Sequence, residues 1–594
     1  MKQQSKLMSN STETLPPIQN TFSYQGEEYD YLFRSWLGKY TSWLSPISYS
    51  MAFEDWLKHL AISPFRQLDI LKQAAMNNFQ LMQYFAQSCA DKNCEVCIQP
   101  QERDSRFEGE PWTKFPFNVL SQGFLLNEKL WNDATSNISG VSEHHQNVVN
   151  FSIRQILDMF SPSNFLWTNP EVLQATQQQA GQNLLRGFNN FINDISRKNK
   201  GLPPAGAEEY QLGVNVAATK GKVIYRNDLI EFIQYEPTTT NVFPEPILIV
   251  PAWIMKYYIL DLSEHNSLVK YLVDKGHTVF MVSWKNPTSE YRKFGIDEYV
   301  NLGILDAIKV INHILPKQKV HVVGYCLGGT LLMITAAYMA RKKDERLKSI
   351  TLFAAQVDFK EAGELLLFVD TSQIDYLENI MWKKGYLDGV QMAGTFSMLH
   401  SNDLIWSKVI RDYLLGQQET VKDLMVWDND TTRLPYKMHS EYLRKLFLNN
   451  DLVEGKFKVN KENIALHDVN APIFTVSTLW DHIAPWKSVY KIQLFTESDV
   501  TFVLTSGGHN AGIVSEPGHP HRNFQMLAHK NKDKYLTPSK WQQKAPSFDG
   551  SWWPKWQEWI AQNSGKEEKP PKLGNSYNGY PILCDAPGTY VFEK

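Results

Sequence analysis

The sequence has few cysteines, almost no excess charge and no long apolar run. Five cysteines among 594 residues are too few for a disulfide framework, and this number fits a reducing cytosol. A formal net charge of −3 argues against a nucleic-acid-binding protein, because phosphate binding needs a basic surface. The longest apolar stretches, such as residues 330–340, fall short of the ~18 residues of a spanning helix. The N-terminus also lacks the apolar core of a secretory signal, so we expect a cytoplasmic protein without a transmembrane segment.

Three of the cysteines, Cys89, Cys94 and Cys97, have the spacing C-x4-C-x2-C. This spacing is typical of plant-type iron–sulfur ligation. Such a cluster needs a fourth thiolate, however, and the next cysteine along the chain is Cys326. We therefore interpret the segment as a polar loop after a helix. We expect no metal site here and no cofactor, and the sequence leaves open whether these three cysteines have any other role.

Two regions of different texture follow a polar N-terminus. Residues 1–20 are polar with a Pro-Pro pair and are predicted to be a disordered tail. From there to residue 205 the apolar residues recur at spacings of three and four, as at Leu68, Leu71, Ala75 and Phe79, which predicts a helical domain over 21–205. The pattern changes at the segment GLPPAG, residues 201–206.

Beyond that segment, short apolar runs rich in β-branched residues alternate with helical patterns. Such runs are typical of strands buried on both faces of a mostly parallel sheet, so we predict an α/β domain over 206–594. About 115 residues of mixed aromatic and polar character separate the fourth run from the fifth, and we expect the part at about 360–465 to form a cap over the active site. The six runs are residues 246–250, 278–283, 320–323, 350–354, 472–476 and 500–504.

The sharpest local motif is G-Y-C-L-G-G at residues 324–329, between an apolar strand and an apolar helix. This is the nucleophile elbow of an α/β-hydrolase fold with cysteine in place of serine. The tight turn between strand and helix needs small neighbours, which Gly324 and Gly328 supply. Cys326 would then lie at a helix N-terminus, which favours a thiolate. The Leu327 N–H would point at the place where an oxyanion forms. A buried structural cysteine is the alternative interpretation, and the strand and helix around the motif favour the nucleophile.

A cysteine nucleophile needs a base and an orienting acid, which in this fold follow in the order nucleophile, acid, histidine. Asp481 comes at the end of the fifth apolar run, and His509 follows the sixth. Active sites of open α/β sheets lie just past the carboxyl ends of the strands. We therefore predict that Asp481 is the acid and His509 the base.

Other residues compete for these roles. Asp358 also follows a strand, but one strand earlier than the commoner acid position. His482 is adjacent to Asp481, although neighbouring side chains after a strand point in different directions. His519 and His521 lie in a proline-bounded loop and could suggest a metal, but no carboxylate or cysteine at ligand spacing accompanies them. We interpret that segment as a surface loop.

The second oxyanion donor in this fold comes from the loop after an early strand. Here that loop is residues 250–256, and we expect the donor to be the backbone N–H of Ile254 or of a residue next to it. A purely structural loop around a core tryptophan is the alternative.

Several motifs taken together resemble the polyhydroxyalkanoate synthases. The similarity extends from about residue 100 to the C-terminus, and the motifs occur in the order that the family shows. The resemblance implies a helical domain before an α/β catalytic domain, and a Cys-Asp-His triad that falls on Cys326, Asp481 and His509. The chain departs from the family pattern at Ala252, Met255 and His400, none of which belongs to the triad. The motifs are at residues 157–173, 253–262, 266–287, 324–329, 396–406, 480–488, 506–514 and 550–556.

The resemblance also implies an activity and its partners. We expect an acyltransferase that polymerises (R)-3-hydroxyacyl-CoA, chiefly 3-hydroxybutyryl-CoA, into a polyester with release of CoA. The expected partners are this substrate, the growing polyester chain, the surface of a polyester granule and a second copy of the chain in a homodimer. The rival enzyme is a cysteine-elbow hydrolase such as a thioesterase or dienelactone hydrolase. A granule-surface protein without activity is the non-enzymatic alternative.

Overall fold

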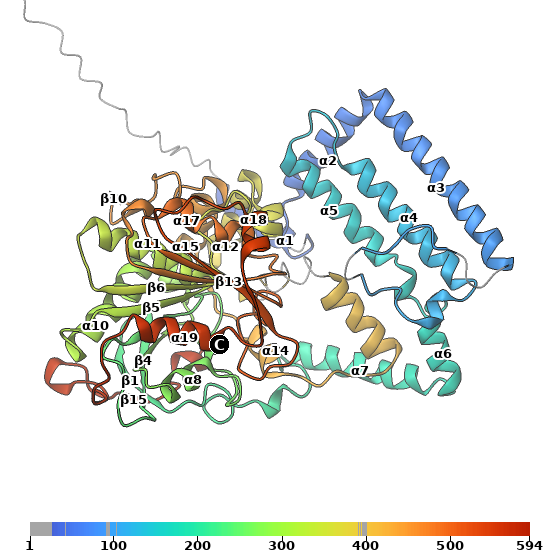
Figure 1. Ribbon diagram of the computed structural model, residues 1–594. Coiled ribbons are helices and arrows are strands. Elements are labelled where there is room, and N and C mark those ends of the chain that lie inside the picture. The colour runs from blue at the N-terminus through green and yellow to red at the C-terminus, as the bar shows by residue number, and fades with distance from the viewer. Residues whose placement is uncertain are drawn as a thin grey trace, which may run out of the picture.

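The computed structural model describes residues 26–41, 43–90, 95–101, 104–389, 391–392, 394 and 401–594. The predicted tail at 1–20 and Cys94 lie outside these residues. Figure 1 shows a helical unit beside an α/β unit. Within the described residues, no helix combines the length and the apolarity that crossing a membrane requires.

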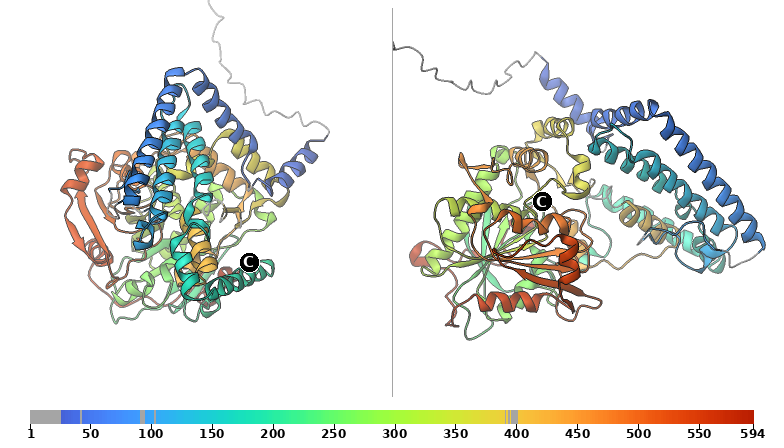
Figure 2. Two further views of the ribbon diagram at one scale, coloured as in Figure 1. Left: turned by 90° about the vertical axis from the view of Figure 1, so that its right-hand side faces the viewer. Right: turned by 45° about the horizontal axis from the view of Figure 1, so that its top comes forward.

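The N-terminal part is helical, as its periodicity predicts. Local signals explain where several of the helices begin: the Ser45 and Ser142 hydroxyls accept from backbone amides of the first turn of α2 and α5, and Asn169 caps α6 ahead of a proline. Figure 2 shows the longer helices standing side by side. The helices are α1 (Glu27–Gly38), α2 (Pro46–Ala61), α3 (Pro64–Ala90), α4 (Phe117–Thr135), α5 (Glu143–Met159), α6 (Pro170–Gln178) and α7 (Gln182–Asn199).

The α/β unit is built on an eleven-stranded sheet in the order β14-β13-β12-β11-β6-β5-β3-β4-β2-β1-β15. All six predicted strands are present and form its parallel centre: β3 (Ile247–Val250), β4 (Val279–Trp284), β5 (Val320–Tyr325), β6 (Leu347–Phe353), β11 (Ile473–Thr478) and β12 (Val500–Thr505). The prediction of a mostly parallel sheet is thus confirmed for its centre. The flanking antiparallel strands were not predicted: β1 (Gly221–Arg226), β2 (Ile230–Tyr235), β13 (Asn523–His529), β14 (Ser547–Asp549) and β15 (Cys584–Asp585).

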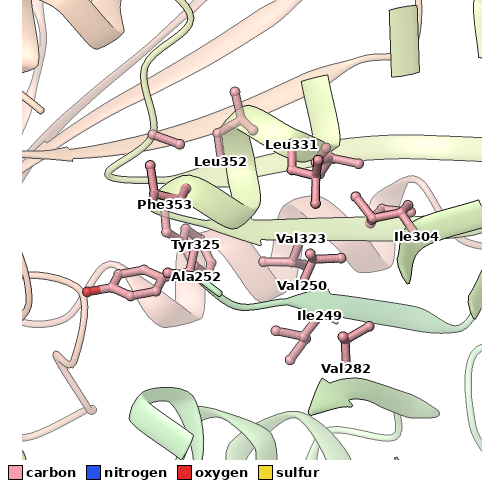
Figure 3. Close-up of a cluster of buried hydrophobic side chains, with 14 of the residues drawn as sticks. Ile249, Val250, Ala252, Val282, Ile304, Val323, Tyr325, Leu331, Leu352 and Phe353 are labelled. Atoms are coloured by element: carbon pink, nitrogen blue, oxygen red, sulfur yellow. The ribbon is translucent and has the colours of Figure 1, made fainter. Parts of the chain in front are cut away.

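Helices cover the sheet and complete its core. Side chains from β3, β4, β5, β6 and α11 meet in one apolar cluster, from which the Tyr325 hydroxyl projects (Figure 3). Trp556 of α19 donates its indole N–H to the Thr351 hydroxyl of β6 at 3.0 Å, which ties that helix to the sheet. The helices are α8 (Leu268–Asp274), α9 (Ile296–Glu298), α10 (Asp306–Ile314), α11 (Leu327–Arg341), α16 (Trp486–Tyr490), α17 (Ile492–Phe495), α18 (Pro538–Lys544) and α19 (Trp553–Gln562).

The chain between β6 and β11 carries further short elements, in the region predicted as a cap. The division of the chain at residue 205 and the cap bounds of about 360–465 stay predictions. The elements are η7 (Gly363–Phe368), α12 (Thr371–Lys384), β7 (Tyr386–Leu387), η8 (Asn402–Trp406), η9 (Val409–Leu414), α14 (Asp423–Asp428), β8 (Leu434–Pro435), α15 (Tyr436–Glu441), η10 (Tyr442–Leu448), β9 (Lys458–Val459) and β10 (Glu462–Asn463).

Several contacts join the helical unit to this cap region. Near α12, the backbone N–H of Ser45 donates to the Gln373 side chain at 2.7 Å, and Tyr31 packs on Trp382 with ring centroids 5.0 Å apart. Near η9, Tyr413 donates its hydroxyl to Asp194 of α7 at 2.9 Å, and Asn183 donates to the Leu414 carbonyl at 2.8 Å. The helical unit therefore packs against the cap region and helps to hold it in place.

Gly187 sets the distance between α7 and η9. A Cβ atom at this position would lie 1.8 Å from the Tyr413 carbonyl oxygen, so Gly187→Ala must push the two helices apart. We expect a loss of stability of about 1–3 kcal/mol and faster hydrogen exchange in residues 408–416. Gly123→Ala in α4 is the control, because its Cβ would meet only the end of the Leu81 side chain. Equal exchange in both variants would contradict the role of Gly187.

A buried histidine makes the sheet sensitive to acid. His321 in β5 is 1% exposed and bonds Ser349 and Ser564, and burial lowers its pKa to about 3. The unfolded chain takes up this proton near pH 6.5, so His321 contributes stability above that pH which is lost as the pH falls toward 3. We expect a loss of roughly 2 kcal/mol at pH 5. The slope of the thermal midpoint between pH 7 and 5 should flatten in His321→Gln but stay unchanged in His265→Gln, an exposed site.

Candidate active site

The turn between β5 and α11 has the strained geometry of a nucleophile elbow. Cys326 has φ 52° and ψ −124°, a conformation that L residues rarely adopt. A Cβ at Gly324 would lie 2.3 Å from the Gly329 Cα, and one at Gly328 would lie 2.2 Å from the Val250 carbonyl oxygen. Both glycines are therefore required by close backbone approach, and the turn presents Cys326 at the start of α11.

The structure brings His509 and Asp481 together at the carboxyl edge of the sheet. Nδ1 of His509 lies 2.8 Å from Oδ2 of Asp481, and the Asp481 side chain is fully buried. Its other carboxylate oxygen accepts the backbone N–H groups of Ile483 and Ala484 at 2.9 and 2.8 Å. These amides fix the carboxylate, which in turn fixes the orientation of the imidazole ring.

The charge of His509 is set by its two neighbours. Burial alone lowers the pKa of His509, but the Asp481 carboxylate and Cys326, which both attract its proton and hydrogen-bond the ring, raise that pKa well above its ordinary value. His509 therefore contacts both the thiol and the carboxylate. This arrangement stabilises the imidazolium that forms when a proton passes from the sulfur to the ring nitrogen.

The competing residues have other partners. Asp358 accepts from Lys491 Nζ at 2.8 Å and from Asn450 at 2.7 Å, and it has no bond to His509 in the described part of the chain. His482 is exposed, while His519 pairs with Glu516 at 2.8 Å. Among the described residues no group of three or more His, Cys, Asp or Glu could hold a metal ion.

The sequence reasoning missed a polar chain beside the triad. Tyr325 donates its hydroxyl to the Asn510 side chain at 2.6 Å, and Asn510 donates to Asp428 at 2.9 Å. Tyr325 directly precedes Cys326 and Asn510 directly follows His509. This closeness in sequence to the predicted catalytic residues was the one feature that could have pointed to them. Asp428 ends α14 in the cap region, and nothing in its local sequence points to the site. Although Asp428 is exposed as a residue, desolvation of its carboxylate raises its pKa, against the opposing effects of His509 and Asn510.

The two backbone amides predicted as oxyanion donors belong to Leu327 and Ile254, and that assignment stays a prediction. Leu327 is the first residue of α11, so its N–H belongs to the free amides of a helix N-terminus. Ile254 lies in the loop after β3, and that loop approaches the elbow closely, since Gly328 abuts Val250 and Pro251. Within the described residues, neither the Leu327 nor the Ile254 amide donates a hydrogen bond. Both are therefore available to a ligand.

Comparison with known proteins decides the family. Residues 25–66 and 103–272 match the profiles of the N-terminal part of poly-beta-hydroxybutyrate polymerase, and residues 245–516 match the alpha/beta hydrolase fold. A poly(3-hydroxyalkanoate) polymerase of Methylorubrum extorquens is 39% identical over 84% of this chain and 82% of its own length. This chain belongs to the poly(3-hydroxyalkanoate) polymerases. The predicted resemblance and the predicted α/β-hydrolase fold are confirmed, and the chain is an enzyme of the acyltransferase type.

Other polymerases show the same similarity. The poly(3-hydroxyalkanoate) polymerase subunit PhaC of Rhizobium meliloti (strain 1021) is 36% identical over 91% of this chain and 87% of its own length. The corresponding subunit of Rhizobium etli is 39% identical over 83% of this chain and 77% of its own length. The similarity to these polymerases therefore extends over both the helical and the α/β unit.

Proposed function

We propose that this polymerase converts (R)-3-hydroxyacyl-CoA, with 3-hydroxybutyryl-CoA as its main substrate, into a polyester with release of CoA. The acyl chain is carried as a thioester on Cys326. The observation that carries the proposal is the chain of contacts from Cys326 through His509 to Asp481, at the carboxyl edge of the sheet. The relatives of this chain are named poly(3-hydroxyalkanoate) polymerases, which supports the proposed reaction. Ile254 and Leu327 supply the oxyanion donors.

The first half-reaction loads the enzyme. His509 takes the proton of the Cys326 thiol, and the sulfur attacks the thioester carbonyl of the substrate. The Leu327 and Ile254 amides stabilise the oxyanion of the tetrahedral intermediate. When this intermediate collapses, the carbon–sulfur bond to CoA breaks and the proton on His509 passes to the departing CoA sulfur. One thioester replaces another, so the step is nearly isoenergetic and suits a thiol better than a serine hydroxyl.

The second half-reaction extends the polymer. The 3-hydroxyl of one acyl unit attacks the thioester carbonyl of another, and its proton passes to His509, which Asp481 orients and supports. An ester bond forms, the carbon–sulfur bond to the enzyme breaks, and the proton returns to the sulfur. Water would end the chain at this stage, and the cap region over the site is suited to exclude it.

The polymer and its granule are the proposed partners in the cytoplasm, together with a second copy of the chain in a homodimer. The long helix α3 offers support for contact with an apolar material, because large apolar side chains along it face solvent. Phe65 is 84% exposed and Met82 is 71% exposed, and Leu71 and Phe79 lie on the surface between them. Exposed apolar stretches of this kind mark interaction sites.

A product assay tests the proposed reaction. Purified protein with 3-hydroxybutyryl-CoA should release CoA and leave an insoluble polyester. The rival cysteine-elbow hydrolase would also release CoA but would leave free 3-hydroxybutyrate. The free acid as sole product would overturn the proposal. A protein that neither releases CoA nor reacts with an acyl analogue at Cys326 would instead favour the non-enzymatic alternative.

A further inference from the structure

A short segment of the cap region, residues 427–432, lies along the loop that carries Ile254. The backbone N–H of Thr432 donates to the Ile254 carbonyl at 2.9 Å, and the N–H of Lys256 donates to the Asp430 carbonyl at 3.1 Å. Trp427 donates its indole N–H to the Lys256 carbonyl at 2.7 Å. The loop after β3 is therefore held by the cap region as well as by the sheet.

Thr432 makes the contacts that control the direction of the loop peptides. Its hydroxyl donates to the Trp253 carbonyl, while its N–H donates to the next carbonyl, that of Ile254. Thr432 is 1% exposed and Trp253 is 3% exposed, so water does not compete for these bonds. Both peptide planes are consequently fixed by one residue.

The N–H groups of these two peptides belong to Ile254 and Met255, and they lie on the side opposite the carbonyls that Thr432 binds. In a trans peptide the N–H points away from the carbonyl of the preceding residue. With the Trp253 carbonyl turned toward Thr432, the Ile254 N–H points away from the cap segment, and the same holds for the Met255 N–H beside the Ile254 carbonyl. These are the amides that the sequence predicts as oxyanion donors, and the cap leaves them free.

We propose that Thr432 is a positioning residue for acyl transfer, which aims the donor amide of the oxyanion hole by binding the Trp253 and Ile254 carbonyls. This inference rests on the proposed function. It also assigns the cap region a second task besides covering the site, because a correctly seated cap completes the oxyanion hole. Thr432 itself touches neither Cys326 nor His509 in the described structure.

The proposal predicts a particular kinetic defect. An oxyanion donor acts on the transition state and contributes little to substrate binding, so a misaligned donor lowers kcat and leaves KM almost unchanged. Loss of a whole donor costs about 10²–10³-fold in kcat, and misalignment should cost less, about 10- to 100-fold. Alkylation of Cys326 by iodoacetamide passes through no oxyanion, so its rate should not change.

The experiment compares Thr432→Val, Thr432→Ser and the wild type in CoA release and in alkylation of Cys326. T432V keeps the shape but loses the hydroxyl, and T432S keeps the hydroxyl. We expect kcat to fall about 10- to 100-fold in T432V with an unchanged alkylation rate, and to stay within about threefold of the wild type in T432S. Thr475→Val is the matched control, because the buried Thr475 hydroxyl has no hydrogen-bond partner in the described residues. Its kcat should not change.

Each other result overturns the inference. Wild-type kcat in T432V refutes it directly, and parallel losses of kcat and alkylation rate show a general distortion of the site. If T432V fails to fold, kcat is compared between Thr432→Ser and Thr432→Cys instead. Serine and cysteine are similar in size, but the thiol is the weaker hydrogen-bond donor. Equal kcat in that pair refutes the role of the hydroxyl. Failure of the proposed function is a separate outcome, because the wild type itself would then form no polyester.

Discussion

Replacement of Cys326 by alanine is expected to abolish CoA release from 3-hydroxybutyryl-CoA, with a fall of roughly 10⁴-fold or more. In the proposed mechanism both half-reactions pass through a bond to this sulfur, so no partial route remains. The elbow should survive the change, because alanine is no larger than cysteine and the glycines at 324 and 328 keep their close contacts. CoA release is followed in a steady-state assay with a thiol reagent.

Cys326→Ser serves as the companion variant. It keeps the side-chain size and the contact to His509 but replaces a strong nucleophile by a weak one. We expect it to be nearly as inactive as the alanine variant, with an unchanged thermal midpoint. Substantial CoA release by either variant would mean that another group carries the acyl chain.

Replacement of Asp481 by asparagine is expected to lower kcat by roughly 10³–10⁴-fold. The variant keeps the volume of the side chain but removes the charge that orients and supports the His509 imidazolium. The Ile483 and Ala484 amides can still bond the remaining carbonyl oxygen, so the loop should keep its place. The control is Asp358→Asn, which disturbs the buried contact to Lys491 and should reduce stability more than kcat.

The same variant carries a pH signature. The carboxylate of Asp481 raises the pKa of His509, so the imidazolium persists to higher pH in the wild type. Without that charge the imidazolium loses its proton at lower pH. Because His509 can take the thiol proton only as the neutral imidazole, the acid limb of the rate profile should move toward lower pH in Asp481→Asn. If the rate at the plateau falls but the pH profile of the variant keeps the position of the wild-type profile, the result would contradict the ion pair between His509 and Asp481.

The centre of the fold, and the meeting of His509 with Asp481 at its carboxyl edge, could be predicted from the sequence because their signals are local. Each central strand is a continuous apolar run, and Gly324 and Gly328 mark a turn that only small residues allow. Asp481 and His509 directly follow such runs. The outer strand β2 was missed because Glu231 and Gln234 interrupt its apolar run, although both are buried. Hydrogen bonds from residues far along the chain offset the cost of burying such polar groups. Glu231, for example, accepts from the backbone amides of Thr589 and Tyr590.

The rest of the site depends on contacts that no local pattern encodes. Asp428 reaches Asn510 across 82 residues, and Thr432 reaches Trp253 across 179 residues. Both residues come from the cap region. Its mixed composition predicted an insertion, but not which residues of the α/β unit the insertion would contact. From sequence the predicted donor is Ile254 or a residue next to it. Thr432 binds the Trp253 and Ile254 carbonyls, which turns the N–H groups of Ile254 and Met255 away from the cap segment.

The covalent intermediate is the most direct test of this account. The enzyme is mixed with 3-hydroxybutyryl-CoA, quenched in acid within the first turnovers, digested and mapped by mass spectrometry. We predict one or more 3-hydroxybutyryl units in thioester linkage on the peptide that contains Cys326, and none on that peptide in Asp481→Asn at the same time point. Polyester formation with Cys326 unmodified throughout would contradict the account.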